Sequence, residues 1–186
     1  HLRVLNDFKK PENFWLSRMS HHTIDPLQPE SIELVKHLID QYSPLFESEY
    51  FNICCDETFD LKKYEKEGQN VGRLYVDFVK KIIDHIQQKG KKVMMWGDIL
   101  LQHPEVIDEL PEDVCFLNWD YGDDPSEKNI EVFEKLNRKQ IVCPGTSIWN
   151  RFCETVEIEE SNISLMAEYG YRHGAYGVLN TNWGDW

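Results

Sequence analysis

Tyr50-Phe51-Asn52-Ile53-Cys54-Cys55-Asp56-Glu57 reads as a short β-strand that ends on two adjacent carboxylates. The first six residues are mostly apolar and favour a strand over the range 50–55. Carboxylates cost free energy when they leave water, so a pair at the mouth of a buried strand indicates chemistry at that point. An ordinary Asp-Glu that opens a loop is the alternative. Asp56 and Glu57 are therefore the first candidates for catalytic residues.

Short apolar segments and amphipathic segments alternate on both sides of this stretch. Before them, the first 25 residues have no periodic pattern and are expected to form a loop. Apolar residues at helical spacing predict a helix that opens at 29–31, and further helices over 70–88, 104–110, 126–136 and 157–169. Strands are predicted over 50–55, 92–96, 114–119, 140–143 and 175–181.

This alternation predicts an α/β fold with parallel βαβ units and a single domain over residues 1–186. A closed (β/α)₈ barrel takes at least about 200 residues, and the 186 residues here supply five strands. The expected fold is therefore an incomplete (β/α)₈ TIM barrel. An open five-stranded doubly wound sheet is the alternative.

Tryptophans stand at or just beyond the ends of the apolar segments, next to acidic or amide residues. They are Trp96, Trp119, Trp149 and Trp183, and each lies in a short polar context such as Trp96-Gly97-Asp98 or Asn118-Trp119-Asp120-Tyr121. Aromatic faces pack on the C–H groups of sugars, and carboxylates or amides bind the hydroxyls. The carboxyl ends of parallel strands meet at one edge, so one shared sugar pocket is expected. Trp149 as a core residue and Asp98 as a helix cap are the alternatives.

Composition excludes several other functions. The formal net charge of −13 disfavours a nucleic-acid partner and an anionic membrane surface. No segment approaches the roughly 20 apolar residues of a membrane-spanning helix. The five cysteines lack paired metal-ligand spacing, so neither a metal nor a cofactor is expected. Reduced cysteines, among them Cys54, Cys115 and Cys143 inside predicted strands, favour a cytoplasmic location.

Phe51-Asn52-Ile53-Cys54-Cys55-Asp56-Glu57-Thr58 resembles the strand-four signature of family 20 glycoside hydrolases, the β-N-acetylhexosaminidases, which usually reads His-x-Gly-Gly-Asp-Glu. The resemblance continues through 96–98, 118–121 and 182–185, and it is closest to the hexosaminidase D-like branch. The chain departs from the signature where Asn52 replaces His and where Cys54-Cys55 replaces two glycines. The resemblance implies strands four to eight of the family's (β/α)₈ barrel.

The same resemblance implies retaining hydrolysis of a terminal β-linked N-acetylglucosamine or N-acetylgalactosamine, in which the substrate's own acetamide oxygen is the nucleophile. Glu57 would be the general acid and then the base, helped to stay protonated by a neighbouring anion and partial burial. Asp56 would orient the acetamide and stabilise the oxazolinium ion. Tyr121 would donate to the acetamide oxygen.

The remaining site residues follow from the same resemblance. Trp96, Trp119 and Trp183 would surround the sugar ring and the acetyl methyl group, and Asp185 would bind ring hydroxyls. Trp149 and Asp98 are further substrate-binding candidates. The expected partner is a glycan or glycoside that contains N-acetylhexosamine. A carbohydrate-binding or catalytically inactive remnant is the alternative. The 186-residue chain alone is expected to be inactive and to self-associate through exposed barrel edges.

Overall fold

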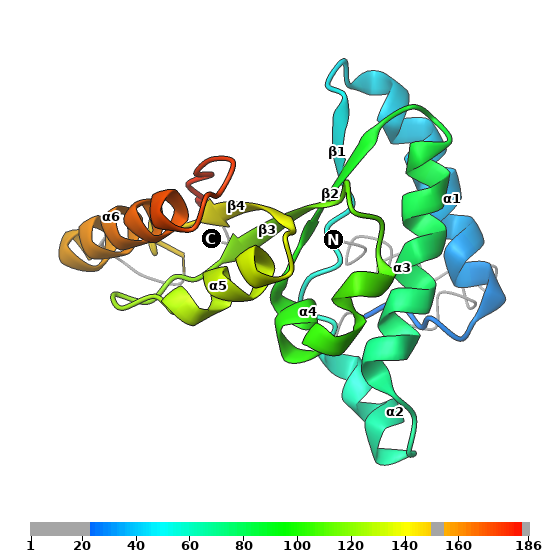
Figure 1. Cartoon of the computed structure of the whole chain (residues 1–186). Coiled ribbons are helices and arrows are strands. Elements are labelled where there is room, and N and C mark those ends of the chain that lie inside the picture. Colours follow the sequence, from blue (N-terminus) through cyan, green and yellow to red (C-terminus); the bar gives the residue numbers. More distant parts are fainter. Residues whose placement is uncertain (1–22, 150–154, 184–186) are drawn as a thin grey trace. The chain divides into compact units, whose positions relative to one another are not determined.

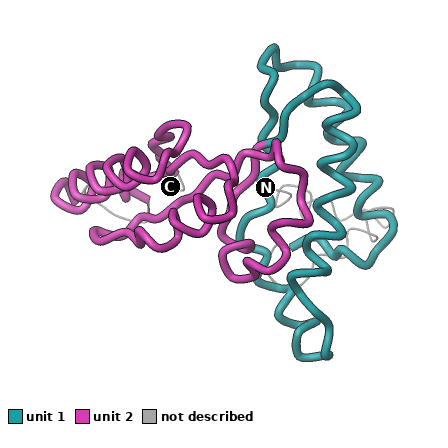
Figure 2. Tube along the Cα trace, in the orientation of Figure 1, with its two compact units in different colours: residues 1–93 teal, residues 94–186 magenta. Residues whose placement is uncertain are grey.

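The computed structural model describes residues 23–149 and 155–183 of the chain. Two compact units divide the chain, residues 1–93 and residues 94–186 (Figure 2). Each unit is built from helices and short strands that follow one another along the sequence (Figure 1). No helix among the described residues is long and apolar enough to cross a membrane.

Unit 1 is mainly helical in its described part. Its elements are α1 (Pro29–Tyr42), the 3₁₀ helix η3 (Ser43–Leu45), β1 (Tyr50–Asn52), η4 (Phe59–Leu61), α2 (Lys62–Lys66) and α3 (Val71–Gln87). The boundary between the units falls within the next strand, β2 (Lys92–Trp96).

Helix α3 forms most of the core of unit 1, because its apolar residues recur on one face. That face is buried and comprises Val71, Tyr75, Val76, Phe78, Val79, Ile82, Ile83 and Ile86. The helix begins after Asn70, whose side-chain Oδ1 accepts a hydrogen bond from the Arg73 N–H at 2.8 Å. It ends before Gly90, whose φ of +75° is a conformation that glycine adopts at little cost. The sequence prediction of a helix over 70–88 is confirmed.

Charged side chains also join α1 and α3. Asp40 on α1 accepts a hydrogen bond from His85 Nε2 at 2.7 Å and forms an ion pair with Lys89. The hydrogen bond from Lys89, followed by that from His85, lowers the pKa of the Asp40 carboxyl. The pairs are exposed, so packing of the apolar faces supplies most of the stability between these helices.

Unit 2 alternates strands and helices as the sequence predicts. After β2 come α4 (Asp98–Gln102), η5 (Pro104–Glu109), β3 (Cys115–Trp119), α5 (Glu127–Lys135), β4 (Lys139–Cys143) and α6 (Val156–Arg172). Strand β3 pairs in parallel with β2, Met94 opposite Cys115, and with β4, Cys115 opposite Lys139. Parallel strands joined through helices form an α/β fold, so that class is confirmed.

Close packing between the strands and their helices stabilises unit 2. Phe116 on β3 stacks on Phe133 of α5 with ring centroids 4.7 Å apart. Helix α6 approaches β4 at Gly170, where a Cβ atom would lie 2.7 Å from a methyl group of Val142. Any larger residue at position 170 would therefore push the helix from the strand.

A buried polar network links β3, β4 and α5. The Asn118 side chain donates to Gln140 Oε1 at 3.2 Å and to the Asn129 carbonyl oxygen at 3.1 Å. Gln140 in turn donates to the Ile130 carbonyl oxygen at 2.9 Å. Buried amides are tolerated when their hydrogen bonds are satisfied, so these residues order the strands as well as fill the core.

Two predicted strands differ from the structure. The first ends at Asn52, because Cys54 and Cys55 have φ values of +61° and +72° and leave the extended conformation. The range 175–181 forms no strand in the described part of the chain. It contacts β4 and the turn after it through two isolated parallel bridges, Val142 with Val178 and Gly145 with Thr181. The sequence pattern missed both outcomes because period-two apolar spacing does not report backbone pairing.

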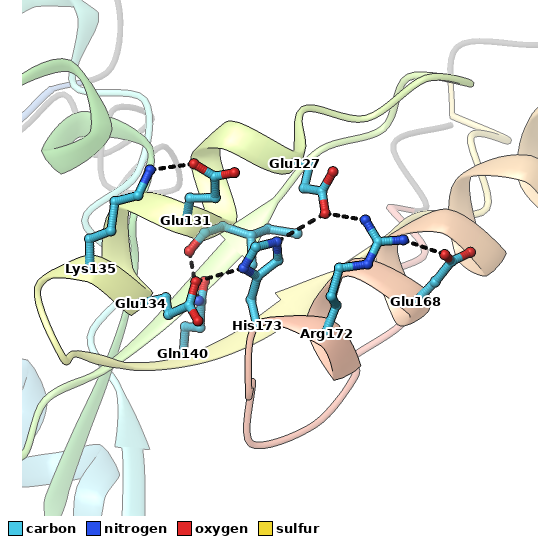
Figure 3. Close-up of polar contacts among 9 residues, drawn as sticks. Glu127, Glu131, Glu134, Lys135, Gln140, Glu168, Arg172 and His173 are labelled. Atoms are coloured by element: carbon cyan, nitrogen blue, oxygen red, sulfur yellow. Dashed lines mark hydrogen bonds and ion pairs between the residues drawn. The ribbon is translucent and has the colours of Figure 1, made fainter.

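The end of α6 is tied to α5 by an exposed polar cluster (Figure 3). His173, directly after α6, places Nδ1 2.6 Å from Glu134 Oε2 and Nε2 3.0 Å from Glu127 Oε1. Arg172 also pairs with Glu127 and with Glu168. Both imidazole nitrogens face carboxylates. The hydrogen bond that His173 donates to Glu134 is the largest cause of its raised pKa, and the bond that it donates to Glu127 adds to it.

This raised pKa predicts a pH-dependent contribution to stability. The contribution is complete below about pH 6.5, the unfolded value, and is lost as the pH rises through the folded value. We expect His173→Gln to lower the free energy of unfolding by about 1 kcal/mol at pH 6, the size of a cation at a helix C-terminus. Thermal unfolding at pH 6 and pH 9 checks this. The loss should vanish at pH 9, whereas Arg172→Gln, which removes a permanent cation, should cost the same at both. An equal loss for His173→Gln at both pH values would contradict the assignment.

Candidate active site

The acidic pair lies in unit 1, on a turn that follows β1. Cys54, Cys55 and Glu57 all have positive φ, between +50° and +72°. The Cys54 N–H donates to Asn52 Oδ1 at 2.9 Å and closes a small turn directly after the strand. Left-handed backbone costs a non-glycine residue roughly 1–2 kcal/mol. Such strain at a short segment is typical of functional sites, where surrounding contacts hold it in place.

One of those contacts comes from α3. The Tyr75 hydroxyl, on the buried face of the helix, donates to the Cys55 carbonyl oxygen at 2.9 Å. After the pair, the Phe59 N–H donates to the Glu57 carbonyl oxygen at 2.8 Å and leads into η4. The backbone on both sides of Asp56 and Glu57 is therefore anchored by hydrogen bonds.

The two carboxylates differ in their surroundings. Asp56 is half-buried, and burial raises the pKa of its carboxyl group above the ordinary value. Glu57 is exposed in the described structure. The partial burial expected for Glu57 is thus found at its neighbour Asp56 instead.

Five of the predicted substrate-binding residues come together in unit 2, and we name them the aromatic cluster: Trp96, Trp119, Tyr121, Trp149 and Trp183. Trp119 stacks on Tyr121 with centroids 4.9 Å apart. Trp149 and Tyr121 pack edge to face with ring centroids 4.8 Å apart, and the centroids of Trp183 and Trp96 are 5.8 Å apart. The spacing of residues at successive strand ends predicts this grouping, and the structure brings the rings into contact.

The strands of unit 2 explain how residues distant in sequence converge. Trp96 and Trp119 are the last residues of β2 and β3, and Trp149 follows β4. Trp183 arrives through the segment that bonds to the turn after β4. The Thr181 N–H donates to the Pro144 carbonyl oxygen at 2.8 Å, and the Thr146 N–H donates to the Thr181 carbonyl oxygen at 3.0 Å.

A hydrogen bond joins the two parts of the aromatic cluster. Trp183 Nε1 donates to the Tyr121 hydroxyl oxygen at 2.9 Å. Indole N–H can only donate, so Tyr121 is the acceptor in this pair. A phenol can accept one hydrogen bond while it donates another, and the contact is compatible with a donor role for Tyr121 towards a ligand.

Of the two acidic residues predicted to bind substrate in unit 2, the structure describes only Asp98. Asp98 is the first residue of α4 and half-buried, the place expected for an acid at a helix N-terminus. Asp185 lies outside the described residues. Trp149 is partly buried within the aromatic cluster rather than in the core of the unit.

The described cysteines are free, and no group of His, Cys, Asp or Glu among residues 23–149 and 155–183 could hold a metal ion. Cys115 and Cys143 are buried in β3 and β4, as predicted. Burial raises their pKa values to about 11 and about 12, so these thiols are chemically inert. Cys54 differs in its position, because it is exposed and lies beyond β1, but desolvation raises the pKa of its thiol as well.

The sequence did not identify Gly145, whose backbone lies against the Tyr121 and Trp149 rings of the aromatic cluster. A Cβ atom there would lie 2.7 Å from Tyr121 Cδ1 and 2.8 Å from Trp149 Cη2. Both rings therefore rest on the Gly145 backbone. A glycine two residues after the predicted strand 140–143, directly behind Pro144, was the available signal, since it allows the close approach of another group.

Gly145→Ala should displace these rings. Overpacking by one methyl group costs roughly 1–3 kcal/mol of stability when its neighbours are rigid aromatic rings. We expect a lower unfolding temperature and a changed near-ultraviolet circular dichroism spectrum. Gly177→Ala is the matched control, because no atom lies within 4 Å of a Cβ atom at that position. An unchanged aromatic spectrum in Gly145→Ala would contradict the packing described here.

Comparison with known proteins gives a family match over most of the chain. The family model described as "Glycosyl hydrolase family 20, catalytic domain" matches residues 8–167. A curated relative, the lacto-N-biosidase of Bifidobacterium bifidum, is 22% identical over 160 residues. That match covers 78% of this chain and 14% of the relative.

Solved structures show the same fold. Dispersin B is 15% identical with a TM-score of 0.59, over 93% of this chain and 57% of that structure. The Flavobacterium johnsoniae chitobiase is 18% identical with a TM-score of 0.58, over 88% of this chain and 26% of that structure. The expected partial (β/α)₈ barrel is thereby confirmed as the fold class. The chain, which spans 14% of its curated relative's length, belongs to glycosyl hydrolase family 20 and forms part of the family's catalytic domain.

Proposed function

We propose that the protein hydrolyses terminal non-reducing β-linked N-acetylhexosamine, N-acetylglucosamine or N-acetylgalactosamine, from glycans. The observation that carries this proposal is the aromatic cluster in a chain of this family. Stacked and edge-on rings at successive strand ends offer the apolar faces that a sugar ring and an acetyl methyl group require. The names of relatives, among them a Vibrio harveyi exo-β-N-acetylglucosaminidase with a TM-score of 0.60, support the same substrate class.

The reaction proceeds with retention through an oxazolinium intermediate. The acetamide oxygen of the substrate attacks the anomeric carbon while Glu57 protonates the leaving oxygen. Water, deprotonated by Glu57, then opens the oxazolinium and restores the acetamide. Glu57 therefore acts as acid in the first step and as base in the second.

Asp56 and Tyr121 act on the acetamide group itself. Asp56 accepts its N–H and stabilises the positive charge of the oxazolinium ion. Tyr121 donates to the acetamide oxygen, and Trp96, Trp119, Trp149 and Trp183 enclose the ring and methyl group. Asp185 and Asp98 bind ring hydroxyls. The raised pKa of Asp56 means that burial opposes its charge, and a cationic intermediate beside it would favour the ionised form.

Hydrolysis of chromogenic β-N-acetylglucosaminides and β-N-acetylgalactosaminides by the full-length protein tests the proposal. Release of the sugar with retained configuration, followed by nuclear magnetic resonance, supports it. Binding of N-acetylglucosamine without turnover of any of these glycosides would instead establish the second candidate, a carbohydrate-binding remnant that keeps the aromatic cluster.

A further inference from the structure

A buried amide on α6 contacts the two loops that carry Tyr121 and Trp149 of the aromatic cluster. Asn162 is completely buried. Its Oδ1 accepts a hydrogen bond from the Gly145 N–H at 3.0 Å. Its Nδ2 donates to the carbonyl oxygens of Asp120 at 2.9 Å and Gly122 at 2.6 Å. One side chain therefore joins the loop after β3 to the loop after β4.

The polarity of these bonds requires an amide. The oxygen faces a backbone N–H, and the nitrogen faces two carbonyl oxygens, so the reverse orientation would oppose like groups on all three sides. Three of the four hydrogen-bonding positions of the side chain are used. Asparagine in a helix interior has a poor intrinsic propensity, and here tertiary bonds compensate for it.

The three partners of Asn162 either adjoin Tyr121 in the chain or lie against its ring. Asp120 and Gly122 are the residues directly before and after Tyr121 in the chain. Gly145 is the backbone on which the Tyr121 and Trp149 rings rest. The neighbouring Ser161 Oγ adds a bond to the Asp123 carbonyl oxygen at 2.8 Å, further along the same loop.

We infer that Asn162 is a positioning residue, which sets the orientation of Tyr121 against Trp149 and thereby the shape of the sugar-binding surface. This inference rests on the proposed function for its consequence in binding and catalysis. Its structural part, the tie between the two loops, holds independently of any substrate. Misplacement of a binding group by about 1 Å can cost roughly 100-fold in rate.

Two substitutions distinguish the hydrogen bond that Asn162 accepts from the two that it donates. Asn162→Asp keeps the acceptor for Gly145 but places a carboxylate opposite two carbonyl oxygens, and Asn162→Ala removes all three bonds. By hydrogen–deuterium exchange, we expect Asn162→Asp to accelerate exchange in residues 120–126 alone. Asn162→Ala should accelerate exchange in that segment and in residues 143–148. Both should change the near-ultraviolet circular dichroism of the aromatic rings.

The effect on function is measured in the same full-length variants. We expect the dissociation constant for N-acetylglucosamine, followed by tryptophan fluorescence, to rise about tenfold and kcat/KM to fall roughly 10- to 100-fold. Met166→Val is the matched control, because Met166 is a buried residue of the same helix that packs on Ile130 and Val142. At a comparable loss of Tm, it should leave sugar affinity and kcat/KM within about twofold, since distant sites act independently.

The outcomes distinguish a failure of the positioning role of Asn162 from a failure of the proposed function. Wild-type exchange and ring spectra in both Asn162 variants would overturn the inference, as would losses of affinity no larger than those of Met166→Val. If the unmodified protein neither binds nor hydrolyses the sugar, the proposed function fails, and the exchange pattern still decides the positioning role. Should Asn162→Asp not fold, Asn162→Gln, which displaces the whole amide on a longer side chain, should accelerate exchange in both loops, and wild-type exchange in that variant would overturn the inference.

Discussion

Glu57→Gln should lower kcat on an alkyl N-acetylglucosaminide by about 10²–10⁴, the usual contribution of a positioned acid–base group. Glutamine can neither protonate the leaving oxygen nor deprotonate water. A nitrophenyl leaving group needs little protonation, so kcat/KM on that substrate, which reports the first step, should fall much less. Steady-state kinetics on the two substrates measures the difference.

Azide provides the decisive control for this role, because an anionic nucleophile needs no base. Added azide should restore turnover of the nitrophenyl glycoside by Glu57→Gln and yield a glycosyl azide of retained configuration. Glu49→Gln, which changes an exposed carboxylate beside β1 that pairs with Lys92, should leave kcat unchanged. Equal losses on both leaving groups without azide rescue would show that Glu57 is not the acid–base residue.

Asp56→Asn should lower kcat/KM by about 10²–10³ on alkyl and nitrophenyl glycosides alike. An amide cannot match the charge of a carboxylate beside the oxazolinium ion, and loss of one such electrostatic contact costs roughly 3–4 kcal/mol. The stabilised charge develops on the acetamide whichever group departs, so the loss should not depend on the leaving group. Azide should not restore the activity, because formation of the intermediate is the impaired step.

The thermal stability of the Asp56→Asn variant is the control for its kinetic effect. Burial raises the pKa of Asp56, so the folded state opposes the charge at neutral pH, and removal of that charge should leave Tm equal or higher. A large loss of Tm would attribute the kinetic effect to misfolding. A leaving-group-dependent loss with azide rescue in Asp56→Asn, and not in Glu57→Gln, would reverse the two roles.

Local patterns predicted the elements whose residues repeat regularly. Helix α3 follows from apolar residues at helical spacing, and β2 follows from its apolar run. The aromatic cluster was also predictable, because the ends of parallel strands share one edge. These features depend on information within a few residues of each position.

Local patterns failed where distant contacts decide the backbone. The range 175–181 has the composition of a strand, yet it makes only two bridges to β4 and the turn after it. Cys54 and Cys55 look like strand residues, but a turn closed by Asn52 and a hydrogen bond from Tyr75 hold both at positive φ. Apolar character could not reveal either result.

The sequence by itself determined the α/β order, the acidic pair Asp56-Glu57 after a strand, and the aromatic residues at later strand ends. Periodicity and short motifs encode these features locally. Only the tertiary structure decided that the strand stops at Asn52, that Gly145 supports two rings, and that Asn162 joins their loops. Each of these properties depends on contacts between residues far apart in the chain, among them the hydrogen bond from Tyr75 to the turn after β1, and no local pattern records those contacts.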